Sequence, residues 1–88
     1  MKEEFGKKML NRLSSAEGHI GAIKNMINEG KCCGEILLQV SAVEAAIRSI
    51  GKCILRNHLE TCVAEGIKSG DESVLGEFGK LLDKYLME

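Results

Sequence analysis

The 88-residue sequence contains no proline and no tryptophan, and these absences limit the range of possible folds. Only 3% of its residues are aromatic, whereas large rings usually fill the cores of small proteins, so the core must be aliphatic. A chain of this size buries only about 60–65% of its unfolded surface and often depends on disulfides, metals or a partner chain. We expect a single domain, residues 1–88, whose core is completed by a second subunit.

The sequence also lacks long apolar runs and an excess of either charge. No apolar stretch reaches the roughly 18 residues of a membrane span, and the charged residues 1–8 do not resemble a signal peptide. We therefore expect a cytoplasmic protein with no membrane partner, whose four cysteines stay reduced and serve metal or redox chemistry. The formal net charge of −1 excludes a generally basic DNA-coating protein but not a local basic face.

Apolar residues recur at helical spacing in three segments. Steps of three and four residues separate the members of each set, which are Met9, Leu13, Ala16, Ile20, Ile23 and Ile27; Ile36, Val40, Val43, Ile47, Ile50 and Ile54; and Val74, Phe78, Leu81 and Tyr85. Between the segments, Gly30 is expected to cap a helix C-terminus and Asp71 a helix N-terminus. The pattern predicts an all-α fold with three helices per chain, at about 4–28, 32–66 and 72–87.

The second predicted helix is too long to be covered within one chain. Its 35 residues span roughly 50 Å, whereas the third helix is short and the first reaches about two-thirds of that length. A helical hairpin that pairs with a second copy covers the apolar seam. We therefore expect a homodimer that forms a four-helix bundle.

The cysteines and histidines favour a soft-metal site. His58 and Cys62 are four residues apart, so they project from one helix face about one turn apart. Cys33 precedes His58 by roughly 37 Å of continuous helix, so it reaches this pair only from a second, antiparallel subunit. Two thiolates and one imidazole suit Cu(I), while Zn(II) or another soft metal stays open if Cys32 adds a fourth ligand.

Two further residues are assigned structural roles. Cys53 lies beside Ile54 on the apolar seam and is interpreted as a small buried apolar residue. His19 lies between Gly18 and Ile20 and is expected to pack or to form a hydrogen bond rather than to bind metal.

Basic residues form stripes on two of the predicted helices. Arg48, Lys52 and Arg56 share one face of the second helix, and Lys8 and Arg12 share a face of the first. Such stripes are either solvated helix faces or phosphate contacts that an oligomer multiplies. No helix-turn-helix, zinc-finger or base-stacking pattern accompanies them.

Three stretches of the sequence resemble the CsoR/RcnR family of bacterial metal-sensing repressors. They are residues 11–20 (NRLSSAEGHI), 39–43 (QVSAV) and 57–63 (NHLETCV), with Cys33 at a matching distance. The resemblance implies an antiparallel four-helix bundle dimer that pairs into a dimer of dimers. This assembly is expected to bind operator DNA in its apo form and to release the DNA when an inducer binds. In the copper branch it implies an inter-subunit site formed by Cys33 from one subunit and His58 and Cys62 from the other.

Differences between the branches of this family favour copper. The nickel and cobalt branch has an additional N-terminal histidine, which residues 1–18 lack; the formaldehyde branch lacks the cysteine found here at Cys62; and the persulfide branch lacks the histidine found at His58. The resemblance also implies that Glu77 supports the histidine, and that Cys32 stands where a tyrosine is usual.

For DNA binding, the resemblance matches Arg12 to a contact position of the family and places Arg48 one residue away from another. We therefore expect a Cu(I)-responsive repressor and not an enzyme. One alternative is a sensor of persulfides or thiol oxidation that uses Cys33 and Cys62. Another, from a different class, is a copper storage or carrier module. A thiol redox enzyme is disfavoured because no cysteine pair has Cys-x-x-Cys spacing.

Overall fold

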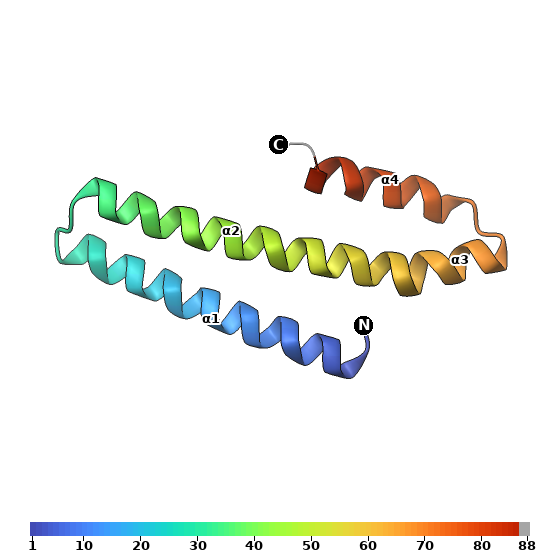
Figure 1. Cartoon of the computed structure of the whole chain (residues 1–88), viewed down its shortest axis with the longest axis horizontal. Coiled ribbons are helices and arrows are strands. Elements are labelled where there is room, and N and C mark those ends of the chain that lie inside the picture. The colour runs from blue at the N-terminus through green and yellow to red at the C-terminus, as the bar shows by residue number, and fades with distance from the viewer. Residues whose placement is uncertain (87–88) are drawn as a thin grey trace. The chain divides into compact units, whose positions relative to one another are not determined.

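The computed structural model describes residues 1–86, which form helices joined by two turns (Figure 1). The elements are α1 (Glu3–Asn28), α2 (Cys33–His58), a π-helical turn η1 (Leu59–Val63), α3 (Ala64–Ser69) and α4 (Ser73–Leu86). Because α2, η1 and α3 follow one another without a break, these residues form three helical segments with no strand among them. The predicted all-α fold with three helices per chain is confirmed.

The helix ends lie close to the expected positions, with one larger difference. The second helical segment continues to Ser69 instead of ending near residue 66. It ends where Gly70 adopts a left-handed conformation with φ +81°. The N–H of Asp71 then bonds the Gly66 carbonyl at 2.8 Å, and the N–H of Gly70 bonds Ile67 at 3.1 Å. This is a Schellman motif, which satisfies the last carbonyls of the helix. Residue 87, which the third predicted helix includes, lies outside the described residues.

The two predicted capping residues act at their turns. Gly30 has φ +72° and closes α1 with the same motif, in which the Lys31 N–H bonds the Met26 carbonyl at 3.0 Å. Asp71 Oδ1 accepts hydrogen bonds from the Ser73 backbone N–H at 3.1 Å and from the Ser73 hydroxyl at 2.6 Å. This carboxylate therefore binds the first residue of α4, as expected of a capping residue.

The described chain falls into two compact units, and residues 2–50 form one of them. Here α1 and the first part of α2 form an antiparallel hairpin (Figure 1). Two side-chain hydrogen bonds cross it: Arg12 Nη2 donates to Ser49 Oγ at 2.7 Å, and His19 Nε2 lies 2.6 Å from Gln39 Oε1. His19 is therefore hydrogen-bonded, which confirms the structural role expected from the sequence.

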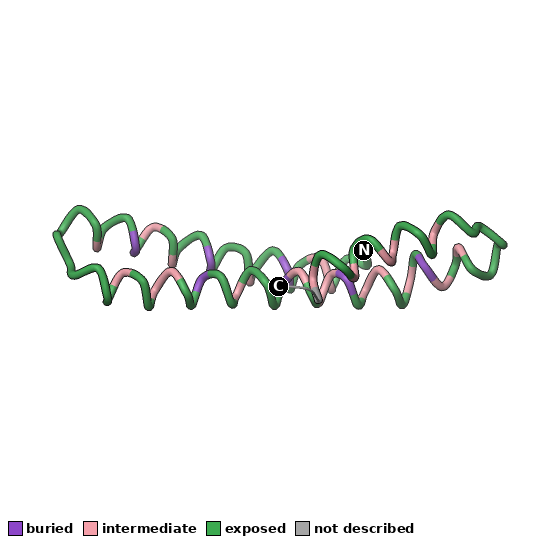
Figure 2. The backbone as a smooth tube through the Cα atoms, turned by 90° about the horizontal axis from the view of Figure 1, so that it is seen from above, coloured by how far each residue is buried: buried purple, intermediate pink, exposed green. Residues whose placement is uncertain are grey.

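Only alternate members of the predicted apolar seam of α1 are buried. On α1, three residues at seven-residue spacing are buried, namely Met9, Ala16 and Ile23. The residues between them, Leu13, Ile20 and Ile27, remain 37%, 45% and 59% exposed. Figure 2 shows this pattern as isolated buried positions along largely exposed helices. A single chain thus leaves a second apolar stripe on α1 in contact with solvent.

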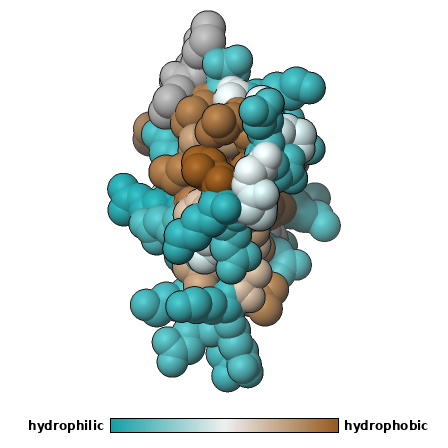
Figure 3. All heavy atoms as spheres, turned by 90° about the vertical axis from the view of Figure 1, so that its right-hand side faces the viewer, coloured by the Kyte–Doolittle hydropathy of each residue, from teal (hydrophilic) through white to brown (hydrophobic). Residues whose placement is uncertain are grey.

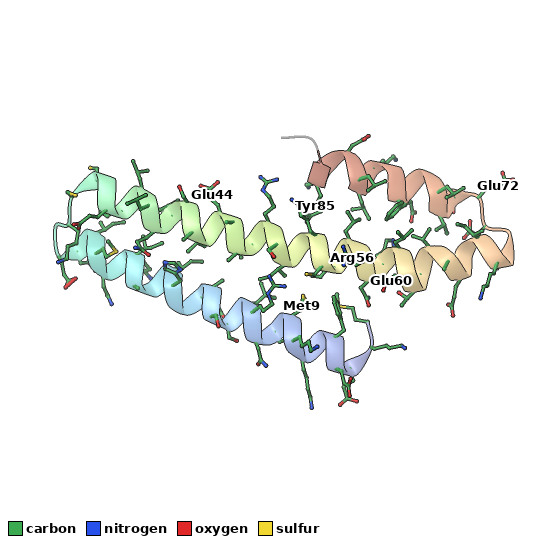
Figure 4. All side chains as sticks on the ribbon, in the orientation of Figure 1. Met9, Glu44, Arg56, Glu60, Glu72 and Tyr85 are labelled. Atoms are coloured by element: carbon green, nitrogen blue, oxygen red, sulfur yellow. The ribbon has the colours of Figure 1, made fainter. Side chains whose placement is uncertain are left out.

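Among the described residues, the second compact unit contains residues 51–86 together with Met1. In it, α4 folds back and packs against η1 and α3. Two glycines allow this close approach, because a Cβ on Gly51 would overlap the Tyr85 ring and one on Gly66 would lie 3.0 Å from Val74 Cβ. Tyr85 points from α4 toward α2 in Figure 4.

Apolar side chains are also exposed in this second unit. They are Leu59, Ile67, Leu75 and Leu81. Figure 3, which looks onto the end that carries the α3–α4 turn, shows apolar side chains at the surface among hydrophilic ones. In the described part of the chain, no helix combines the length and the apolar character that a membrane span requires.

Candidate metal centre and DNA-binding residues

Two of the three predicted metal ligands lie together in the second unit. His58 is the last residue of α2, and Cys62 belongs to η1. Both side chains line one cavity of about 360 Å³, whose other walls are mainly apolar and include Leu55, Leu81 and Tyr85. Cys62 is exposed, so its thiol is accessible from solvent. The thiol of Cys62 and the imidazole of His58 thus line the same largely apolar cavity.

The imidazole of His58 is half-buried against α4. Its ring centroid lies 6.4 Å from that of Phe78, with the two planes inclined by 40°. This separation and tilt fall within the range of aromatic pairs that attract one another. The contact limits the orientations open to the His58 ring.

Cys62 is positioned differently, by the π-helical turn η1 in which it lies. The Ala64 N–H bonds the Leu59 carbonyl, five residues earlier, instead of the four of an α-helix. The Thr61 hydroxyl donates to the Asn57 carbonyl at 2.8 Å and lies 3.5 Å from Cys62 Sγ. The sequence predicted an uninterrupted α-helix here. Hydrophobic spacing did not reveal the wider turn, because an apolar pattern in steps of three and four fits both.

Cys33, the third predicted ligand, belongs to the other unit. It is the first residue of α2, and His58 is the last, so helical rise alone separates them by about 37 Å. Within the residues that the structure describes, no group of three His, Cys, Asp or Glu side chains in one chain could hold a metal ion. A single chain brings His58 and Cys62 together but does not bring Cys33 to them.

Cys32 and Cys53 lie elsewhere on the same helical segment. Cys32 precedes α2, and its carbonyl accepts a hydrogen bond from the Ile36 N–H at 3.2 Å. Cys32 and Cys33 are both exposed, so this turn presents two adjacent accessible thiols. Cys53 is half-buried on α2.

Glu77, the predicted support of His58, is exposed on α4. Phe78, the next residue, makes the ring contact with His58. In the sequence, Phe78 and Tyr85 are recognisable only as parts of an apolar seam. A glycine in the middle of a helix, Gly51, was the available signal that a bulky side chain approaches closely there.

The predicted DNA-binding residues differ in their surroundings. Lys8, Arg48, Lys52 and Arg56 are exposed, and the last three follow one another at four-residue spacing on α2. Arg56 is labelled in Figure 4, where Glu60 follows it one turn later. Arg12 is half-buried and uses one of its five N–H donors on Ser49, which ties α1 to α2.

Comparisons with known proteins show which proteins this chain resembles in sequence. Residues 6–84 match the family model described as "Metal-sensitive transcriptional repressor". The chain is 40% identical over 76 residues to the copper-sensing transcriptional repressor CsoR of Bacillus subtilis, covering 85% of this chain and 75% of that protein.

Two solved structures have a similar fold. One is the copper-sensing repressor CsoR with Cu(I) from Geobacillus thermodenitrificans, with a TM-score of 0.90 and 29% identity over 98% of this chain and 91% of that one. The other is the nickel-responsive transcriptional regulator InrS, with a TM-score of 0.78 and 38% identity over 90% of each chain. From the family model and the sequence identity, the chain belongs to the family of metal-sensitive transcriptional repressors.

Proposed function

We propose that this protein is a Cu(I)-responsive transcriptional repressor. Its metal-free form binds operator DNA and releases the DNA when Cu(I) binds to Cys33 of one chain and to His58 and Cys62 of another. The observation that carries the proposal is the meeting of His58 and the exposed Cys62 at one cavity. Relatives named as copper-sensing repressors support it.

The donor set fits the chemistry of the metal. Thiolate sulfur is a soft ligand that selects Cu(I), and imidazole nitrogen also suits copper. Sites with three ligands and no fourth protein donor are unusual for structural Zn(II), which prefers four. Zn(II) or another soft metal becomes a competitor if Cys32, adjacent to Cys33, also coordinates.

The length of α2 supports a site shared between two chains. Cys33 and His58 occupy its two ends, so antiparallel packing of two copies of α2 brings Cys33 of each copy to the His58 end of the other. A two-fold axis then generates two equivalent sites. The exposed stripe of Leu13, Ile20 and Ile27 gives such a dimer, and a dimer of dimers, apolar surface to bury.

Residues around His58 restrict its imidazole. Phe78 packs on the ring, and Glu77 lies on the same helix one residue earlier. We propose that Glu77 accepts a hydrogen bond from the ring nitrogen that does not bind metal, as acceptors near metal-bound histidines commonly do. Cu(I) supplies, when bound, the link between Cys33 of one chain and the His58–Cys62 pair of the other.

The basic residues supply the surface for DNA. Lys52, Arg56 and Arg48 form one stripe on α2, to which Lys8 and Arg12 of α1 add charge in an oligomer. Each phosphate neutralised by such a residue releases counterions and steepens the dependence of binding on salt. We infer a binding function in the cytoplasm and no enzymatic one, in line with a family of transcriptional repressors.

A DNA-binding assay tests the proposal. The metal-free protein is used to select DNA fragments from a random library. Its affinity for the selected fragments is then measured by gel-shift titration with and without one equivalent of Cu(I). Allosteric coupling of about 1–3 kcal/mol predicts that Cu(I) weakens binding by about 5–150-fold. A complex that persists with Cu(I) bound contradicts the proposal, and failure to select any DNA at low salt favours a copper carrier instead.

Replacement of the histidine separates copper sensing from sulfur sensing. His58→Ala should abolish the response to Cu(I), because one of three ligands is lost, whereas a persulfide sensor that uses Cys33 and Cys62 would keep its response to polysulfide. Cys53→Ser, which changes a half-buried cysteine outside the proposed triad, serves as the matched control and should respond to Cu(I) as the original protein does.

A further inference from the structure

The π-helical turn η1 links the two ligands that the proposed function takes from one chain. His58 ends α2, and Cys62 lies inside η1. Because a π-helical turn holds an extra residue, it rotates the residues that follow it relative to those that precede it. The direction of the Cys62 sulfur relative to the His58 imidazole therefore depends on this turn. Such turns are often found at functional sites.

Thr61 is the side chain that contacts both the backbone of this region and Cys62. It is half-buried, and its hydroxyl lies 2.8 Å from the Asn57 carbonyl oxygen and 3.5 Å from Cys62 Sγ. A threonine that bonds the carbonyl four residues earlier loosens a helix and often bends it. Thr61 thus has contacts suited both to stabilising the irregular turn and to orienting the thiol.

The hydroxyl of Thr61 cannot serve both acceptors at once. It carries one hydrogen, which goes either to the Asn57 carbonyl or to Cys62 Sγ. A neutral thiol is a weak acceptor, so the shorter contact to Asn57 holds the hydrogen in the metal-free protein. Metal coordination requires the thiolate, and hydrogen bonds to an ionised acceptor are roughly twice as strong as neutral ones. Coordination at Cys62 therefore draws the hydrogen toward sulfur.

We propose that Thr61 is a positioning residue whose hydroxyl orients the Cys62 sulfur and relays its coordination state to the backbone at the junction of α2 and η1. The inference rests on the proposed function, because it takes Cys62 as a metal ligand. When the hydrogen moves to sulfur, the Asn57 carbonyl loses its side-chain donor. Asn57 directly follows Arg56, so this change occurs one residue from the basic stripe of α2.

The test compares two substitutions that distinguish the contribution of the Thr61 hydroxyl from that of its methyl group. Thr61→Val keeps the shape but removes the hydroxyl, whereas Thr61→Ser keeps the hydroxyl. In the full-length protein, Cu(I) affinity is measured by competition with a chromogenic chelator. Loss of a group that supports a metal ligand typically weakens binding by about 10–100-fold, which is expected for Thr61→Val. Thr61→Ser should stay within about 3-fold of the original protein, well below that range.

A second readout uses the metal-free protein. The rate at which iodoacetamide alkylates Cys62 is mapped by mass spectrometry, with Cys33 of the same molecule as the internal reference. Iodoacetamide reacts with the thiolate, the form of Cys62 that draws the Thr61 hydrogen toward sulfur. Thr61→Val should therefore lower the ratio of the Cys62 rate to the Cys33 rate, and Thr61→Ser should preserve it. If Thr61→Val fails to fold, as judged by its helical circular dichroism, Thr61→Ala replaces it against the same serine variant.

The outcomes separate this inference from the proposed function. If both Thr61 variants match the original protein in both readouts, or if serine fails as fully as valine, Thr61 has no positioning role through its hydroxyl. If Cys62→Ser and His58→Ala retain the original Cu(I) affinity, the proposed metal site itself is wrong. Loss of binding in those two variants, with normal behaviour of Thr61→Val, overturns the Thr61 inference alone.

Discussion

His58 and Cys62 are held in place by different kinds of interaction. The imidazole packs on an aromatic ring from another helix, Phe78, whereas Cys62 lies inside η1 and its sulfur is contacted by the Thr61 hydroxyl. Side chains that support a metal ligand fix its orientation and affect affinity nearly as much as the ligand itself. The two proposed ligands should therefore respond differently to changes in α4 and to changes in η1.

Glu77 and Phe78 should support His58 by different means. Glu77→Gln removes the proposed charged acceptor while keeping size, so Cu(I) affinity should fall by about 10-fold with little change in unfolding free energy. Phe78→Ala removes a packed ring and should lower both the Cu(I) affinity and the unfolding free energy. The loss of stability should reach up to about 3 kcal/mol, because Phe78 is only half-buried. Chelator competition and urea unfolding measure the two quantities. Unchanged affinity in Glu77→Gln would remove Glu77 from the site.

At the scale of the helices, the position of α4 depends on glycines that leave room for it. Gly51 on α2 faces the Tyr85 ring, and Gly66 on α3 faces Val74. Without these two glycines, α4 could not approach the segment that carries His58 and Cys62. The packing of α4 is thus a condition for the Phe78–His58 contact.

Gly51→Ala should displace Tyr85 and loosen α4. Overpacking of this kind typically costs about 1–3 kcal/mol, which outweighs the gain of roughly 0.5–1 kcal/mol from replacing a helical glycine by alanine. Gly76→Ala, on the same helix as Tyr85 but with nothing within 4 Å of its added Cβ, is the control and should stabilise the protein. Thermal unfolding compares the two. Equal stabilisation by both substitutions would show that Tyr85 does not pack on Gly51.

The helices could be predicted from the sequence, whereas the turn at the site could not. Apolar steps of three and four, with Gly30 and Asp71 at the turns, reflect helical geometry and backbone sterics that act locally. The π-helical turn involves a side-chain hydrogen bond from Thr61 to the backbone, which leaves no mark on hydropathy. Spacing alone identified His58 and Cys62 as neighbours. It could not identify Phe78 as a partner of His58, because that contact joins separate helices.

At the scale of the whole molecule, one chain leaves part of its apolar surface exposed and its proposed metal site incomplete. Leu13, Ile20 and Ile27 remain exposed on α1, and Cys33 lies at the opposite end of α2 from His58. Both features follow from a long helix in a short chain. Under the proposed function, a second copy completes both of them.

The basic stripe on α2 should contribute to DNA binding through phosphate contacts. Lys52→Ala and Arg56→Ala should each weaken binding about equally across DNA sequences. Each should also reduce the slope of log affinity against log salt by about 1. Lys80→Ala, which removes an exposed lysine of α4, is the matched control. Gel-shift titrations at several salt concentrations measure the slopes. If Lys80→Ala changes the slope as much as the other two, the effect is one of net charge and not of a defined stripe.

The inter-subunit origin of the metal site is tested by mixing two inactive variants. Cys33→Ser and Cys62→Ser should each lose tight Cu(I) binding alone, because every site in either homodimer lacks a thiolate. After unfolding and refolding together, heterodimers should contain one intact site, with Cys33 from one chain and His58 and Cys62 from the other. Cu(I) titration of the mixture should therefore recover tight binding, whereas a mixture of His58→Ala and Cys62→Ser should not. Tight binding that fails to return when Cys33→Ser and Cys62→Ser are mixed would contradict a site shared between two chains.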